Sequence, residues 1–136
     1  MPPHGMIVGD NWYAILVAAV AIYAVGFVIY GGLSKVWMSL TGYTKEQLAP
    51  HRWKMALSPI MPILTAIGLA LVLKSAMIDN AATAVWTALE VWFFLVLPAR
   101  LYNFVYGPEK PGLLTMDAIH LLLGLLVAGA IIGSWP

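Results

Sequence analysis

The sequence predicts an all-α membrane protein, because of its composition and its long apolar stretches. Hydrophobic residues make up 62% of the chain and charged residues 10%, and the mean hydropathy is +0.88. Charged residues are about a quarter of an ordinary soluble domain, so a soluble fold could not cover this much apolar surface. In a bilayer only helices or closed barrels satisfy the backbone, and the period-two alternation of barrel strands is missing. The spans are therefore expected to be helices.

Four apolar stretches are each long enough to cross the ~30 Å hydrocarbon layer, which takes about 20 helical residues. They cover residues 11–33, 55–76, 81–106 and 113–135, approximately. The short connections leave no room for a second globular domain in 136 residues. We expect one transmembrane domain over residues 1–136, with the four helices packed as a bundle in lipid.

The first span, 11–33, carries Ala19, Tyr23, Gly26 and Tyr30 on one face. Residues three or four apart share a helix face, so both phenols could reach polar groups of the other spans. Aromatic packing beside small residues is the simpler explanation of the same pattern.

The connection 34–54 mixes basic and apolar residues, and we expect it to lie half-buried along the headgroups on the cytoplasmic side. Thr44, with Gln47 three positions later, predicts a capping box that opens a short helix, which Pro50 would end. A docking site for a partner is the functional alternative for this segment.

The second span, 55–76, has Pro59 and Pro62 in its first turns. One proline is tolerated in the first turn of a helix, but two at this spacing leave backbone carbonyls without donors. The pattern predicts a kink or a late start of this helix.

The third span, 81–106, contains Glu90 with no basic residue at its level. An intramembrane carboxyl group is a functional candidate by default. Glu90 is expected to be protonated, to bond a hydroxyl group such as that of Tyr23 or Thr65, or to face a polar cavity. A proton or ligand site formed with Tyr23, a neutral packing role and a contact with a partner subunit are the alternatives.

The fourth span, 113–135, places Asp117 and His120 on one face, three residues apart. The hairpin closed by GPEKPG brings Asp117 and Arg100 to a similar depth, where an unpaired charge would cost ~2.5 to 3.5 kcal/mol. We therefore expect an ion pair between Arg100 and Asp117, with His120 beside it. A proton relay or ligand site built from these three residues is the functional alternative.

Small residues on the fourth span indicate where other helices pack. Gly124 and Ala128 continue the face of Asp117, whereas Gly129 and Gly133 form a GxxxG pair on another part of the surface. This pair favours close helix contact and is a weak indication of a dimer.

Catalytic motifs are missing from the sequence, which has no phosphate-binding glycine loop, no HExxH and no nucleophile elbow. The sequence has no cysteine, which excludes disulfides and cysteine-ligated metals. Its three histidines are too few to favour a metal site with a histidine triad. We predict no enzymatic activity, no metal site and no cofactor besides lipid. Haem or a chlorophyll-type pigment on His120 is disfavoured because no second histidine lies within a span. A net charge of +1 argues against nucleic-acid binding.

The basic residues indicate the orientation. One side of the membrane would hold Lys35, Lys45, Arg52, Lys54, Arg100 and Lys110, and the other side only Lys74. Positive charge accumulates on the cytoplasmic side, so both termini are expected on the periplasmic side.

Two segments of the sequence resemble a known family. They are NWYAILVAAVAIYAVGFVIYGGLSKVWMSLTG and LYNFVYGPEKPGLLTMDAIHLLLGLLVAGAIIG, with Asn11-Trp12 at the start, Lys35, Trp37 and Met38 after the first span, Asn103-Phe104, and the spacing of Asp117 and His120. In combination they resemble the bacterial membrane family called domain of unknown function 1761. The resemblance implies a four-helix protein of the bacterial inner membrane and no established activity.

Two hypotheses of function follow. The first is a non-enzymatic membrane protein that acts through assembly, as a homo-oligomer or an accessory subunit of a larger complex. The alternative is a small oligomeric transporter or channel that uses Glu90 and the cluster of Arg100, Asp117 and His120.

Overall fold

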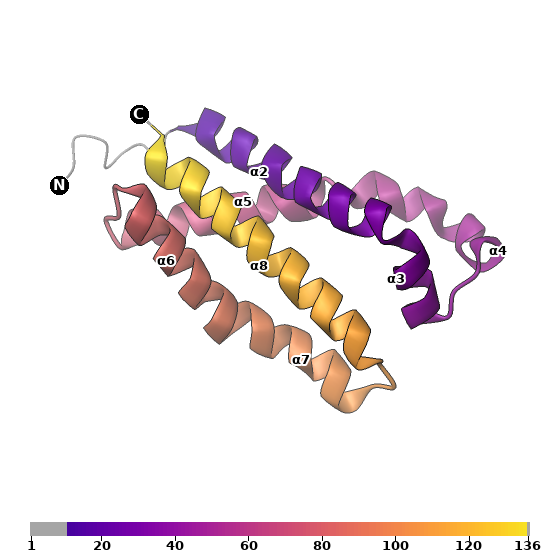
Figure 1. Ribbon diagram of the computed structural model, residues 1–136. Coiled ribbons are helices and arrows are strands. Elements are labelled where there is room, and N and C mark those ends of the chain that lie inside the picture. The colour runs from indigo at the N-terminus through magenta and orange to yellow at the C-terminus, as the bar shows by residue number, and fades with distance from the viewer. Residues whose placement is uncertain (1–10, 136) are drawn as a thin grey trace.

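The computed structural model describes residues 11–135, and every regular element within that range is helical (Figure 1). Four helical segments are long and apolar enough to cross a membrane, namely Trp12–Gly31, Lys45–Ser75, Ala81–Tyr106 and Pro111–Ser134. The predicted all-α class and the four apolar helices are thereby confirmed. The expected position of the two termini concerns residues outside the described range.

The first long helix consists of α2 (Trp12–Gly26) and the π-helical turn η1 (Phe27–Gly31). The side chain of Asn11 caps α2 by accepting a hydrogen bond from a backbone N–H of the first turn. A separate helix, α3 (Ser34–Thr41), follows and ends at Gly42, whose φ of 76° is a left-handed conformation that suits glycine.

The predicted capping box is confirmed at the start of α4 (Lys45–Leu48). The backbone N–H of Gln47 donates to Thr44 Oγ1 at 3.2 Å, and that of Thr44 donates to Gln47 Oε1 at 2.9 Å. The α-helix ends at Leu48, just before Pro50 as expected, but the chain goes on as a 3₁₀ helix rather than leaving helical geometry. Pro50 lies in the first turn of the next helical segment, where a missing N–H breaks no internal bond, so the chain continues as helix.

The second long helix therefore begins well before the predicted residue 55. It continues from α4 through the 3₁₀ segment η2 (Ala49–Leu57) into α5 (Ile60–Ser75). Pro59 lies at the N-cap of α5, so the α-helical geometry starts late, as the two prolines predicted.

The third long helix consists of α6 (Ala81–Val91), the π-helical turn η3 (Trp92–Val96) and α7 (Leu97–Tyr106). Pro98 has no N–H to donate, and the π-helical turn ends two residues before it. The fourth is the 24-residue α8 (Pro111–Ser134).

Helix α8 packs against both α2 and α6, and α5 packs against α2 (Figure 1). Small side chains allow this close packing, since Ala18, Ala84, Ala88 and Ala128 are completely buried. A Cβ added to Gly124 would lie 3.3 Å from the side chain of Ile22 on α2.

The GxxxG pair of α8 faces α6 within the same chain. A Cβ added to Gly129 would lie 3.0 Å from the carbonyl oxygen of Ala84, and one added to Gly133 would lie 2.9 Å from that of Asn80. Both glycines thus permit close backbone contact between α8 and α6. The motif does not supply the dimer contact that the sequence suggested.

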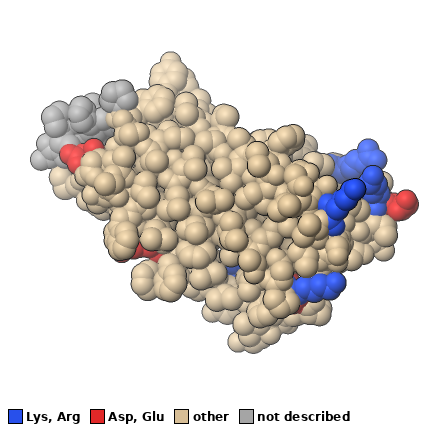
Figure 2. Space-filling view, viewed as in Figure 1, with Lys and Arg blue, Asp and Glu red and all other residues tan. Residues whose placement is uncertain are grey.

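Basic side chains gather at one end of the molecule, beside α3 and α4 (Figure 2). At this end Lys110 Nζ donates to the carbonyl oxygen of Ser39 at 3.3 Å, which joins the turn between α7 and α8 to the end of α3. The two connections that the charge pattern assigned to one side of the membrane are therefore neighbours.

Candidate functional site

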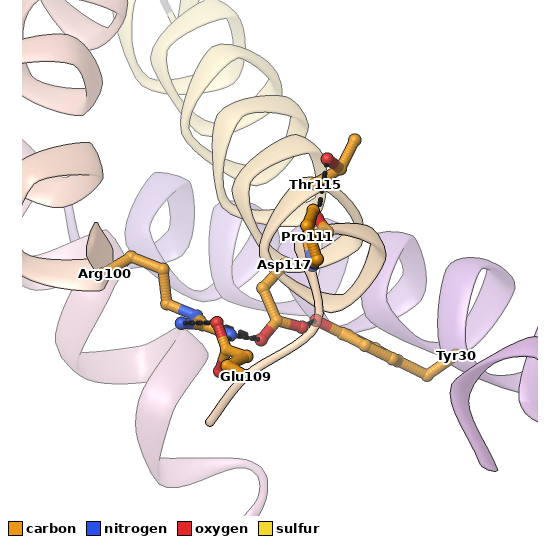
Figure 3. A network of polar contacts seen from close by, with 6 residues as sticks. All are labelled: Tyr30, Arg100, Glu109, Pro111, Thr115 and Asp117. Atoms are coloured by element: carbon orange, nitrogen blue, oxygen red, sulfur yellow. Dashed lines mark hydrogen bonds and ion pairs between the residues drawn. The ribbon is translucent and has the colours of Figure 1, made fainter. Parts of the chain in front are cut away.

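A network of polar side chains joins the hairpin of α7 and α8 (Figure 3). The guanidinium of Arg100 donates to both oxygens of Glu109, from Nη1 at 2.7 Å and from Nη2 at 2.8 Å. It also donates to Asp117 Oδ2, from Nε at 3.0 Å and from Nη2 at 2.7 Å. The planar fork of arginine suits two carboxylates at once, which an ammonium group could not bind in this way.

Tyr30 extends the network to the first long helix. Its phenol donates to Asp117 Oδ1, while Oδ2 of the same carboxylate accepts from Arg100 (Figure 3). The network is largely shielded, because the side chains of Arg100, Glu109 and Asp117 are 12%, 14% and 23% exposed. With both carboxylates ionised it carries a formal charge of −1, and it connects η1, α7 and α8.

Part of this network was predictable from the sequence. The expected pair of Arg100 and Asp117 is present, and Tyr30 reaches the polar cluster as its helix face suggested. Glu109 was not predicted, because it lies in the GPEKPG turn and outside the apolar spans. Glu109 lies between two prolines and close in sequence to Arg100, and this position could have indicated an ion pair between the two residues.

His120 lies beside the network and is half-buried. Its ring meets that of Tyr30 edge-on, with centroids 4.9 Å apart. A Cβ on Gly26 would lie only 2.9 Å from His120 Nε2, so the glycine makes room for the imidazole. Among residues 11–135, no protein group forms a hydrogen bond with this imidazole.

A cavity of about 690 Å³ opens next to His120, between the first long helix, the second long helix and α8. Its wall is mainly apolar, including Ile22, Phe27, Met61 and Leu125. The polar residues that line it are Tyr23, Tyr30, Ser58, Thr65 and His120. The cavity and the charged network are therefore adjacent, with Tyr30 belonging to both.

Glu90 lies apart from this site, on the exposed surface of α6. The expected hydroxyl partners bond elsewhere, since Tyr23 pairs with Ser58 Oγ at 3.3 Å and Thr65 donates to the carbonyl of Met61 at 2.8 Å. The site of Glu90 with Tyr23 that the sequence suggested is thus not formed within the chain. Both prospective partners face the cavity between other helices, whereas α6 packs mainly on α8.

Among residues 11–135, no three acidic or histidine side chains lie close enough together to hold a metal ion. The chemistry available at the cavity is instead hydrogen bonding by neutral groups beside a charged cluster.

The sequence profile described as Protein of unknown function (DUF1761) matches residues 13–133. The chain belongs to the DUF1761 family. The match includes the second span and every residue of the network and cavity described above. Neither the curated proteins nor the solved structures provided a match to this DUF1761 chain.

Proposed function

We propose that this DUF1761 protein is an integral protein of the bacterial inner membrane that acts through assembly, as a homo-oligomer formed by the face of its third long helix that carries Glu90. The observation behind this proposal is the exposure of Glu90 in the middle of an apolar, membrane-length helix.

The third long helix is the least buried of the four within the chain. In its most apolar window 11% of residues are buried, against 22% to 39% in the other three helices. Its exposed side chains include the large apolar residues Trp86, Phe93 and Phe94 around Glu90. This helix therefore has the most surface left for a partner.

Exposing the carboxyl group of Glu90 to lipid costs free energy. It lies nine residues into α6, roughly 13 Å along the helix axis. Thr83, Thr87 and Glu90 follow one another at helical spacing and form a polar line on the face. A polar line of this kind is stabilised when it meets another helix that can hydrogen-bond to it.

A second copy of the chain is the partner that this face fits best. In a two-fold symmetric contact the same patch meets itself, so two Glu90 carboxyl groups could share a proton in a hydrogen bond without any basic partner. The GxxxG pair of α8 is already used within the chain, which leaves the face of Glu90 as the candidate interface.

The mass of the complex in lipid nanodiscs or in mild detergent tests the proposal. The wild-type protein should form a dimer or a larger oligomer, and Glu90→Ala should shift it to monomers. Glu46→Ala changes an exposed carboxylate in the first turn of the second long helix, away from the third long helix, and should have no effect. A monomeric wild-type protein without a co-purifying partner, or an unchanged oligomer in Glu90→Ala, would contradict it. A different co-purifying membrane protein would point to an accessory subunit instead.

Transport is the second candidate, and the cavity beside the charged network favours it. Because Glu90 lies apart from Asp117 and His120, a pathway that uses all three would require more than one chain. Flux into proteoliposomes should then depend on Glu90 and Asp117. Absence of flux, or flux that is unchanged in Glu90→Gln and Asp117→Asn, would exclude it.

A further inference from the structure

We infer that the cavity beside His120 binds a neutral, lipid-soluble molecule whose polar head carries a carbonyl or hydroxyl group. This site is separate from the face of Glu90, so the inference does not depend on the proposed assembly.

The size and lining of the cavity suit such a ligand. A volume of about 690 Å³ lies within the range of roughly 300 to 1,000 Å³ that is usual for sites of small molecules. Methionine, phenylalanine, leucine and isoleucine side chains form the apolar part of the wall together with Pro62 and Val96, and a few polar groups interrupt it. Apolar walls with few polar groups hold a hydrophobic body and orient one polar head.

The imidazole of His120 is the one polar side chain of the wall that forms no hydrogen bond with a described residue, so both of its nitrogens can bind that head. Tyr30 donates to Asp117, Thr65 donates to a backbone carbonyl, and Tyr23 pairs with Ser58. Within residues 11–135 His120 has no such partner, although it lines the cavity. A neutral imidazole offers one donor and one acceptor, so it can bind either a carbonyl or a hydroxyl group.

The charges around the cavity favour a neutral head. No Lys, Arg, Asp or Glu is among the described residues that line it. An anionic head would find no free cation, since the guanidinium of Arg100 already binds two carboxylates. The formal charge of −1 on the network behind Tyr30 would also repel an anion. A cationic head would find no carboxylate on the wall.

Two glycines create the space for this arrangement. Gly26 leaves room for the imidazole, and Gly124 lies one turn along α8 from His120 and also lines the cavity. A side chain at Gly26 would press on His120 Nε2 and change the position of the imidazole, which forms no hydrogen bond with a described residue.

Native mass spectrometry of the protein released from nanodiscs tests the inference with three probes. Decylubiquinone carries carbonyl groups, 1-dodecanol carries a hydroxyl group, and decanesulfonate carries a permanent negative charge on a similar chain. We expect saturable binding of one molecule per chain for at least one neutral probe, and no saturable binding of decanesulfonate. The preference between the neutral probes identifies the head group.

Variants of His120 make the test specific. His120→Phe keeps an aromatic ring beside Tyr30 but removes both hydrogen-bonding nitrogens, and it should weaken binding by about tenfold, the effect of one hydrogen bond. His120→Leu is the second variant. Gly68→Ala is the control, because a Cβ there meets nothing within 4 Å.

Three results would overturn the inference. The first is that the wild-type protein and the folded His120 variants bind the neutral probes with equal affinity. The second is that decanesulfonate binds as tightly as the neutral probes, and the third is a tightly held phospholipid that neither neutral probe displaces. The comparison of probes uses the wild-type protein, so it remains decisive if both His120 variants fail to fold.

Discussion

Asp117 on α8 accepts a hydrogen bond from Tyr30, a residue 87 positions earlier in the chain. Through this contact the ion pairs of the last hairpin are joined to the first long helix. The network therefore fixes the position of the first long helix relative to α7 and α8, rather than closing the hairpin of α7 and α8 alone.

Arg100→Leu should destabilise the protein more than any other single change in the network. It leaves two shielded carboxylates without a counter-charge, and removing one partner of a buried ion pair costs about 3 to 5 kcal/mol. Thermal unfolding in a constant detergent measures the effect, with Arg52→Leu, an exposed arginine in η2, as the control. Adding Asp117→Leu should restore part of the loss. If it restores nothing, Arg100 and Asp117 are not coupled.

Tyr30→Phe should lower the free energy of unfolding by about 1.5 to 3 kcal/mol, the usual effect of a hydrogen bond to a charged group. The phenylalanine ring would keep the edge-on contact with His120. Tyr106→Phe is the matched control, because Tyr106 is 82% exposed and no side-chain hydrogen bond to a residue of the range 11–135 is seen for it. Equal effects of the two substitutions would show that the bond to Asp117 contributes little.

Gly133→Ala should separate α8 from α6 and lower the melting temperature. The added Cβ would meet the Cβ of Ala84 and the backbone of Asn80, and backbone cannot move aside cheaply. Gly68→Ala in α5 should be neutral or stabilising by up to about 1 kcal/mol, since alanine favours a helix more than glycine does. A melting temperature of Gly133→Ala no lower than that of Gly68→Ala would contradict the packing described.

Cysteine labelling in intact cells tests the proposed orientation, because the native chain has no cysteine. Asp79→Cys, between α5 and α6, should react with a membrane-impermeant maleimide. Lys45→Cys should react only after the membrane is permeabilised. Both residues are exposed at opposite ends of the second long helix, so the reverse pattern would mean the opposite orientation.

Elements set by local patterns were predictable from the sequence. Apolar length identified the four long helices, and the spacing of Thr44 and Gln47 identified a capping box. Counting residues from the GPEKPG turn was enough to pair Arg100 with Asp117, since a hairpin fixes their relative depth.

Features that depend on the angles between helices were not predictable in this way. The GxxxG pair could face a second chain or α6, and only the packed structure decides between them. The cavity exists because α5 and α2 leave space beside α8, which no local pattern specifies. Glu109 belongs to the network only because the turn folds back toward Arg100.

Disulfide cross-linking in native membranes tests the proposed assembly most directly. In the cysteine-free chain, Phe94→Cys lies one turn beyond Glu90 on the proposed face, while Val20→Cys is equally exposed, but on α2. Oxidation should join Phe94→Cys chains into covalent dimers and leave Val20→Cys chains monomeric, and Glu90→Ala should abolish the dimers. Equal cross-linking at both positions, or none at Phe94→Cys, would contradict assembly through the face of Glu90.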